Sequence, residues 1–332
     1  MTSTPDKQIS SPLLDVQNLS VRFSTPEAKY SVVSHVSFSI QKGEVFGLVG
    51  ESGCGKSITA LSILGIQPPQ ATREGRIVFD GRDLVGLPED AMRSVRGKDI
   101  GMVFQEPMTS LNPVLTVGYQ VAEALLAHFD IPKKEALARA VELLRAVRIP
   151  SPEARIKDYP HQMSGGMRQR VMIAMAIACN PALLIADEPT TALDVTIQYQ
   201  ILKLMQEMRQ ERGMALLLIT HDLSIVSEHA DRVAIMYAGR IMEQASVRDL
   251  FAEPLHPYTI GLLRSLPRSR GTALRPIPGF VPPPYDLPKG CTFSDRCFAA
   301  EEACRTAEPE LREAGPGHFV RCIKAGSITG EP

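Results

Sequence analysis

The sequence lacks any apolar run that approaches the roughly 20 residues needed to span a bilayer. The longest candidates, Ala182–Ala186 and Ala215–Ile219, are interrupted within a few residues. Residues 1–12 are polar and lack a basic segment followed by an apolar stretch, so we do not expect a secretory signal peptide. We therefore expect a chain that does not cross a membrane by itself and that stays in the cytosol, where thiols are kept reduced.

The sequence also has almost no net charge. Lys and Arg number 36 and Asp and Glu number 37, so the formal charge is -1 at pH 7. No global positive field is available to draw the chain onto nucleic acid or anionic lipid. Hydrophobic residues at 44% and charged residues at 22% exclude a wholly disordered or fibrous chain. The 332 residues can bury one large core, with or without an appendage.

Residues 13–266 alternate short apolar β runs with helical patterns. The spacing predicts helices over Ser57–Leu64 and Val195–Arg212, with a helical insertion over residues 115–149. Buried strands are predicted at Val45–Val49, Gly75–Phe79, Ile100–Phe104, Leu183–Ala186, Ala215–Thr220 and Val233–Tyr237. This order predicts an α/β fold built on a mostly parallel sheet with helices on both faces.

The composition changes after residue 266. Prolines crowd residues 276–288, at Pro276, Pro278, Pro282, Pro283, Pro284 and Pro288. Because proline fixes φ and removes a backbone donor, residues 267–288 are predicted to form an extended connector. Residues 289–324 follow as a compact tail with four of the six cysteines. That tail is too short to fold on an apolar core alone, so we expect it to need a staple.

A glycine-rich loop joins the strand predicted at Val45–Val49 to the helix that follows. It fits the phosphate-loop pattern, in which backbone N–H groups converge on phosphate oxygens at a helix N-terminus, over Gly50, Glu51, Ser52, Gly53, Cys54, Gly55, Lys56 and Ser57. In that pattern Lys56 reaches the β and γ phosphates and Ser57 ligates Mg²⁺. Few chance matches also sit between a strand and a helix, so a plain glycine-rich turn is a poor alternative.

Two carboxylates end the strand predicted at Leu183–Ala186. Ligands bind at the carboxyl ends of strands in open α/β sheets, so Asp187 is predicted to hold Mg²⁺ and Glu188 to polarise an attacking water. Such a pair is often a solvated loop when seen alone, but a phosphate loop in the same chain favours the functional interpretation. A third motif, Ser164-Gly165-Gly166, precedes a run with helical spacing and by itself predicts only a capped helix.

Together these motifs resemble the ATP-binding subunits of ABC transporters, over nearly the whole chain. The resemblance makes Ser164-Gly165-Gly166 the signature, Gln105 the Q-loop glutamine, Ala192-Leu193-Asp194 the D-loop and His221 the switch histidine. Within the family, the chain looks like the dipeptide and oligopeptide importer branch in residues 105–113, 164–176 and 256–259 and in the cysteine tail. Met163 and Met167 replace the usual leucine and glutamine of the signature, so a side-chain amide at residue 167 is not assumed.

The resemblance implies a P-loop NTPase fold of the ABC type over residues 13–266. It implies a mostly parallel core sheet, an antiparallel β subdomain and a helical subdomain at about residues 106–180. ATP would lie between the phosphate loop of one subunit and the signature helix of another. The implied roles are catalysis by Glu188, His221 and Gln105, Mg²⁺ binding by Ser57, Gln105 and Asp187, nucleotide contacts from Asp194, and adenine stacking by Tyr30 or, alternatively, Phe23.

The resemblance also implies partners and a place in the cell. The partners are a second ATPase subunit, expected to be a paralogue, two integral membrane permeases and an extracytoplasmic peptide-binding protein that acts through them. The chain would hydrolyse ATP at the cytoplasmic face of the inner membrane and power import of dipeptides or oligopeptides. Related branches carry nickel, glutathione or antimicrobial peptides. Two rivals are a soluble ABC-type ATPase on nucleic acid, which the charge opposes, and a non-hydrolysing subunit, which intact Lys56, Asp187 and Glu188 oppose.

Four cysteines lie in the tail, at Cys291, Cys297, Cys304 and Cys322. The gaps of five, six and seventeen residues lack the Cys-x-x-Cys pairs of common zinc modules. In the importer branch, the tail resembles a segment that binds a 4Fe-4S cluster, for which four thiolates are the right ligand set. Zinc and reduced structural thiols stay open as alternatives. Cys54 and Cys179 stand apart, and Cys54 is interpreted as a small tolerated loop residue.

Overall fold

The computed structural model describes residues 11–24, 26, 28–106, 110–191, 193–266 and 276–327. Three sets of residues from the sequence analysis lie outside the described residues: 107–109 of the segment after Gln105, Ala192 of the predicted D-loop, and 267–275 of the predicted connector. In the described part of the chain, no helix is both long and apolar enough to span a bilayer.

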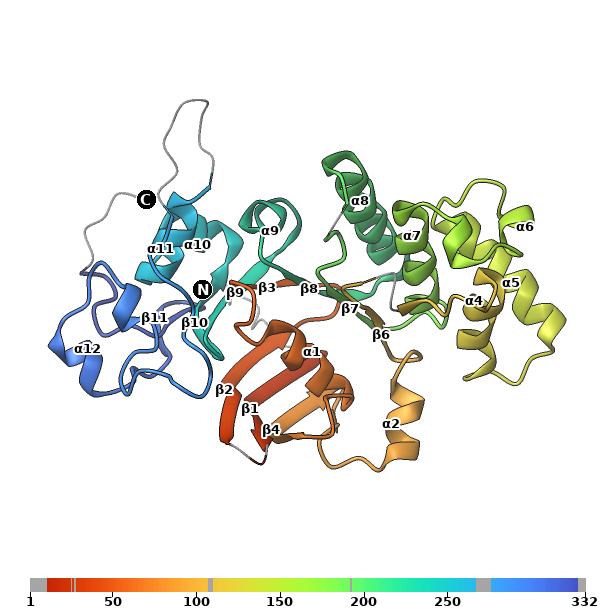
Figure 1. Ribbon diagram of the computed structural model, residues 1–332. Coiled ribbons are helices and arrows are strands. Elements are labelled where there is room, and N and C mark those ends of the chain that lie inside the picture. Colours follow the sequence, from red (N-terminus) through yellow and green to blue (C-terminus); the bar gives the residue numbers. More distant parts are fainter. Residues whose placement is uncertain are drawn as a thin grey trace, which may run out of the picture.

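A large sheet of eight strands forms the centre of the molecule (Figure 1). Its strands, in spatial order, are β11 (Arg312–Gly315), β12 (His318–Val320), β10 (Arg240–Ser246), β9 (Arg232–Tyr237), β3 (Val45–Val49), β8 (Ala215–Thr220), β7 (Leu183–Asp187) and β6 (Ile100–Val103). The five strands from β9 to β6 are parallel, whereas β10, β12 and β11 pair antiparallel at one edge. The predicted parallel sheet is therefore confirmed for the central strands, and the antiparallel edge makes the whole sheet mixed.

A second, four-stranded sheet lies beneath the first and is antiparallel throughout (Figure 1). Its strands, in spatial order, are β2 (Lys29–Ile40), β1 (Leu14–Ser24), β4 (Ala71–Phe79) and β5 (Arg82–Asp83). Strand β4 starts at Ala71, four residues before the predicted start at Gly75. This sheet is the antiparallel subdomain that the resemblance implied.

The helices lie on both sides of the large sheet and at its two ends. Helices α4 (Val117–Leu126) and α5 (Lys133–Ala146) form the predicted helical insertion, followed by α6 (Pro152–Arg155), η1 (Pro160–Gln162) and α7 (Gly165–Ala176). Helix α8 (Val195–Arg212) agrees with its predicted bounds. The others are α1 (Lys56–Leu64), α2 (Glu89–Val95), α9 (Leu223–His229), α10 (Val247–Ala252), α11 (Pro257–Arg264), η2 (Ser294–Arg296) and α12 (Glu302–Thr306).

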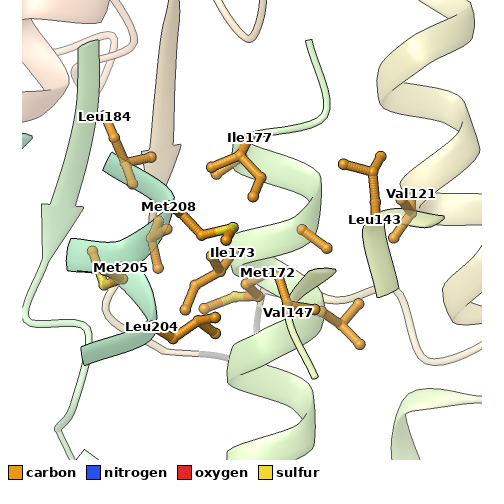
Figure 2. Packing of buried hydrophobic residues seen from close by; sticks show 14 of the residues in the cluster. Val121, Leu143, Val147, Met172, Ile173, Ile177, Leu184, Leu204, Met205 and Met208 are labelled. Atoms are coloured by element: carbon orange, nitrogen blue, oxygen red, sulfur yellow. The ribbon is translucent and has the colours of Figure 1, made fainter. Parts of the chain in front are cut away.

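The apolar runs of the central strands are explained by burial on both faces. Successive side chains of a strand point to opposite faces, so Leu184 joins one core and its neighbours Leu183 and Ile185 join another. The first core lies between the sheet and the helical insertion and includes Met172 of α7 and Met205 of α8 (Figure 2). The second core fills the space between the two sheets.

The C-terminal region joins the sheet rather than standing beside it. Strand β12 pairs with β10, and Glu243 of β10 is fully buried. Its carboxylate accepts the backbone N–H groups of Leu255 at 2.7 Å and His256 at 3.0 Å and lies 2.8 Å from Nε2 of His318. A buried carboxylate is tolerable only with such partners. The tail thus shares a core with the domain, which the sequence analysis did not foresee.

Candidate nucleotide-binding site

The predicted phosphate loop lies between β3 and α1, as the pattern requires. Gly50 starts the loop where the backbone of the neighbouring strand passes very close. A Cβ at Gly50 would stand 2.1 Å from the carbonyl oxygen of Met236, so a larger residue does not fit there. Cys54 is fully buried, and burial raises the pKa of its thiol to about 11. It is therefore an unreactive thiol at neutral pH, which supports its interpretation as a small loop residue.

Lys56 starts helix α1 with its side chain folded back over the loop. Its ammonium donates to the carbonyl oxygens of Gly50 at 2.8 Å and Glu51 at 3.1 Å, and the residue is 4% exposed. The same Nζ atom lies 3.8 Å from Oε1 of Glu188. The loop therefore holds a buried positive charge, whose partners are two neutral carbonyls, the Cys54 sulfur at 4.0 Å and one carboxylate.

Four predicted site segments lie at one edge of the sheet because each follows a parallel strand. The phosphate loop follows β3, His221 follows β8, Asp187 and Glu188 end β7, and Gln105 follows β6. These strands are consecutive neighbours in the order β3, β8, β7, β6. Their carboxyl ends meet at the same edge, where open α/β sheets bind ligands.

Glu188 is the meeting point of these segments. Its Oε2 atom accepts from Nε2 of Gln105 at 3.3 Å and from Oγ1 of Thr191 at 2.9 Å, and it lies 3.3 Å from Nδ1 of His221. Its backbone has a φ of 44°, an unfavourable left-handed conformation for a residue with a Cβ. The structure therefore brings Lys56, Gln105 and His221 together around one carboxylate.

Asp187 lies one residue earlier and is almost completely buried, at 4% exposed. Burial raises the pKa of its carboxyl, and a hydrogen bond with the Ser57 side chain opposes that rise. The Oδ1 atom of Asp187 has no hydrogen-bond partner. Ser57 and Asp187 thus present a hydroxyl and an unsatisfied carboxylate oxygen side by side, and hard cations such as Mg²⁺ prefer oxygen donors of this kind.

The signature residues lie apart from this cluster. Helix α7 starts as predicted, with the Ser164 hydroxyl accepting from the N–H of Met167 at 3.4 Å. Gly166 packs against Ile197 at the start of α8, whose N-cap is Asp194. Among the described residues, no hydrogen bond or ion pair joins Ser164, Gly165 or Gly166 to the phosphate loop. Val195, the first residue of α8, is 82% exposed, and Tyr199 on the same helix is 56% exposed.

The aromatic candidates for adenine stacking lie together. The rings of Phe23 and Tyr30 stack with centroids 5.9 Å apart and planes 7° apart. Tyr285, from the predicted connector, meets Tyr30 edge-on at 6.1 Å. Both predicted rings therefore lie in one aromatic cluster, and the sequence analysis missed its third member.

The four tail cysteines line one small cavity of about 20 Å³. Burial is the main cause that raises the pKa of Cys291 and Cys297 to about 11, and nearby cysteines raise both further. His256 lines the same cavity and is 1% exposed. Its Nδ1 accepts from the N–H of Tyr258 at 3.0 Å, so the proton is on Nε2, which has no hydrogen-bond partner. The cavity therefore combines four sulfur atoms with an unsatisfied N–H donor.

A single metal ion is not accommodated by these side chains as they stand. Across the described ranges, no three or more His, Cys, Asp or Glu side chains are arranged to hold one ion. One zinc ion requires its sulfur donors about 2.3 Å from a common point. The thiols share a cavity without converging on such a point.

Comparison with known proteins places this architecture in a family. Residues 33–191 match the ABC transporter family, and residues 242–304 match the C-terminal region of oligopeptide/dipeptide transporters. The chain is 52% identical to the probable peptide ABC transporter ATP-binding protein y4tR of Sinorhizobium fredii, over 99% of this chain and 98% of that protein. The chain belongs to the ATP-binding subunits of the oligopeptide and dipeptide ABC transporters. It is an ATPase subunit that powers peptide import through such a transporter.

Other relatives of this ABC subunit agree. The chain is 52% identical to the oligopeptide transport ATP-binding protein AppD of Bacillus subtilis, over 94% of this chain and 97% of that protein. It is 50% identical to the dipeptide transport ATP-binding protein DppD of Haemophilus influenzae, over 96% and 98%. A solved post-hydrolysis dimer of the ATP-binding cassette MJ0796, bound to ADP and Pi, aligns with a TM-score of 0.64 at 28% identity, over 71% of this chain and 99% of that one. The predicted family and fold are therefore confirmed.

Some residues of this ABC subunit's site were missed by the sequence analysis. Thr191 contacts Glu188, yet a lone threonine in a loop has no signal of its own. Arg296 and Tyr258 contact the phosphate loop from the C-terminal region. Tyr258 belongs to the segment 256–259, which was noted for its resemblance to the importer branch but was given no role. Its contact with the loop could be found only in three dimensions.

Proposed function

We propose that this subunit hydrolyses ATP in a site shared with a second ATPase subunit and so drives peptides through two membrane permeases. One observation carries the proposal. The loop, Lys56 and the residues around Glu188 meet at one sheet edge, whereas the signature at Ser164 lies elsewhere in the same chain. A complete site therefore requires the signature of another subunit.

Within one chain, the proposed chemistry starts with the loop. Backbone N–H groups at the start of α1 and the Lys56 ammonium bind the phosphates, and Lys56 exchanges its contacts with the Gly50 and Glu51 carbonyls for phosphate oxygens. Ser57, Asp187 and Gln105 are the proposed Mg²⁺ ligands, and the ion supplies positive charge to the β and γ phosphates. The unsatisfied Oδ1 of Asp187 supports this assignment.

Glu188 is the proposed catalytic base. Its carboxylate accepts a proton from, and orients, the water that attacks the γ-phosphorus. His221 and Gln105, both 3.3 Å from its Oε2 atom, are placed to sense the γ-phosphate and hold the water. The constrained backbone of Glu188 supports a functional role, because strained residues persist where the surrounding structure requires them.

The second subunit is proposed to cover the γ-phosphate with its own Ser164-type helix start. Exposed Val195 and Tyr199 on α8 support a partner surface beside the signature and Asp194. The solved dimer of the related cassette with ADP and Pi is consistent with such a pair. We propose a paralogous partner, with adenine stacked in the cluster of Tyr30.

Exposed apolar residues support contact with permeases beyond the Q-loop. Phe104 is 40% and Val114 is 76% exposed on either side of the segment after Gln105. We place the subunit at the cytoplasmic face of the inner membrane, with an extracytoplasmic peptide-binding protein that acts through the permeases. Dipeptides or oligopeptides are the proposed cargo, as the names of the relatives suggest. The near-zero charge argues against a role on nucleic acid.

We further propose that the four tail cysteines ligate a 4Fe-4S cluster. The donor chemistry fits, because four thiolates bind the four irons of such a cluster, and the cavity of about 20 Å³ would have to widen to admit it. The unsatisfied Nε2–H of His256 in the same cavity supports a bound group that accepts hydrogen bonds, as cluster sulfurs do. The cluster would crosslink the four cysteines and so stabilise the fold of the tail.

The test is purification of the tagged subunit from its native membrane, followed by transport in vesicles. We expect two permeases and a second ATPase to co-purify and the complex, with its binding protein, to accumulate labelled peptide only with hydrolysable ATP. Uptake of Ni²⁺ or glutathione instead of peptide would change the cargo. A subunit that co-purifies with DNA and without permeases would refute the proposal.

A further inference from the structure

An ion pair joins the C-terminal region directly to the phosphate loop. Nη1 of Arg296 donates to both carboxylate oxygens of Glu51, at 3.1 and 3.0 Å. The two residues are 245 positions apart in the chain. The side chain of Arg296 is 7% exposed and that of Glu51 is 30% exposed, so the pair is partly buried.

The guanidinium of Arg296 is fixed by further contacts. Its Nε donates to the carbonyl oxygen of Pro278 at 2.8 Å, and Nη1 lies 3.4 Å from the hydroxyl of Tyr237. The cation also stands over the Tyr237 ring, 5.6 Å from its centroid. An arginine held on several sides loses little further freedom when it binds its carboxylate. It is therefore a preorganised partner for Glu51.

A second contact reaches the backbone of the same loop residue. The N–H of Glu51 donates to the hydroxyl of Tyr258 at 3.2 Å, and Tyr258 is fully buried in α11. The carbonyl of Glu51, in turn, accepts from Lys56 at 3.1 Å. The C-terminal region thus contacts both the side chain and the backbone of Glu51, and the Glu51 carbonyl contacts Lys56.

The charge of Glu51 explains why its contacts with Arg296 and Tyr258 matter. The loop must bind a triphosphate, and a carboxylate within it repels that anion unless a cation neutralises it. Lys56 is needed at the phosphates, so Arg296 is the cation left to pair with Glu51. We infer that Arg296 is a positioning residue of the nucleotide site: it neutralises Glu51 and, with Tyr258, clamps the phosphate loop in its binding conformation. This inference rests on the proposed function, since it requires nucleotide at the loop.

The experiment measures Mg-ATP binding by titration calorimetry on the purified complex. Replacing Arg296→Gln leaves Glu51 uncompensated, and we expect the Kd to rise about tenfold, equivalent to about 1.4 kcal/mol. The double variant Glu51→Gln with Arg296→Gln removes both charges and should recover most of that loss. Arg296→Lys keeps the charge without the planar guanidinium, so its Kd should lie between those of the wild type and of Arg296→Gln.

The matched control is Arg305→Gln in the same region. Arg305 pairs with Asp295 at 2.7 Å, and both side chains are more than half exposed, so its loss should leave the Kd unchanged. Thermal unfolding of every variant shows whether the fold is intact. If Arg296→Gln binds like the wild type, or if adding Glu51→Gln recovers nothing, the clamp is refuted. A wild-type complex that binds no Mg-ATP would instead refute the proposed function itself.

Discussion

Replacement of Glu188→Gln tests the centre of the proposed site. The amide has nearly the shape of the carboxylate but cannot take a proton from water. The amide retains an oxygen that can accept from Oγ1 of Thr191 and Nε2 of Gln105. In the wild-type protein these atoms lie 2.9 and 3.3 Å from Oε2 of Glu188. The 3.8 Å contact with Lys56 loses its charge attraction, which frees the lysine for phosphate. We therefore expect ATP binding to persist while hydrolysis fails.

The magnitude follows from the role assigned to the carboxylate. General-base catalysis contributes about 10²–10⁴-fold to a rate, which corresponds to roughly 3–5 kcal/mol of activation free energy. Single-turnover hydrolysis of labelled ATP at this subunit's site should slow by that factor. Nucleotide retained by the complex after rapid desalting should rise, because the closed state cannot discharge its γ-phosphate.

A matched control is Glu228→Gln on the neighbouring helix α9. The Glu228 side chain is 67% exposed and its Oε2 atom lies 3.9 Å from Nε2 of His229, so its charge should not affect hydrolysis. A Glu188→Gln protein that hydrolyses ATP at the wild-type rate at this site would refute the assignment of the base. Loss of nucleotide binding together with hydrolysis would show that Glu188 acts in binding instead.

Three further predictions concern stability and the tail. Asp187→Asn should raise the melting temperature of the nucleotide-free protein at pH 7, because the raised pKa of Asp187 means that its ionisation opposes folding. This penalty is absent below pH 3.8 and constant above the folded-state pKa. Equal melting curves of the two proteins at pH 7 would contradict the prediction. Cys297→Ser should abolish bound iron and sulfide in anaerobically prepared protein, and equal contents in both proteins would exclude the cluster. Phe293→Ala should lower the free energy of unfolding in urea by about 3–5 kcal/mol, because Phe293 is 1% exposed and its ring centroid lies 5.2 Å from that of Tyr237. Phe298 is 55% exposed, so Phe298→Ala should cost little, and equal losses in the two variants would contradict the packing of Phe293.

The central fold was predictable because its signals are local. The runs at Val45–Val49 and Ala215–Thr220 match β3 and β8, since buried parallel strands consist of continuous apolar residues. The sequence pattern predicts a strand that starts at Gly75, but this glycine lies within β4, beside an irregular pairing with β1. A Cβ there would stand 2.6 Å from the carbonyl oxygen of Asn18, so this glycine permits close approach of two strands. A close contact with a distant strand has no local signature.

The site residues were predictable to the extent that each follows a strand. Asp187 and Glu188 could be located from a short motif and His221 from the family resemblance, and parallel order alone predicts that such ends meet. The domain boundaries and the roles of individual residues stay predictions. Thr191 was missed because its hydrogen bond to Glu188 depends on the turn after β7, where neighbouring threonines look equivalent in sequence.

The phosphate loop, the acidic strand end and the family follow from the amino-acid sequence, because those features depend on residues that are neighbours in the chain. Only the tertiary structure decided that β12 completes the sheet and that Arg296 holds Glu51. Both contacts join segments far apart in sequence, and the energy of such a contact depends on burial and on which charges remain to be paired. Those conditions exist only once the chain has folded.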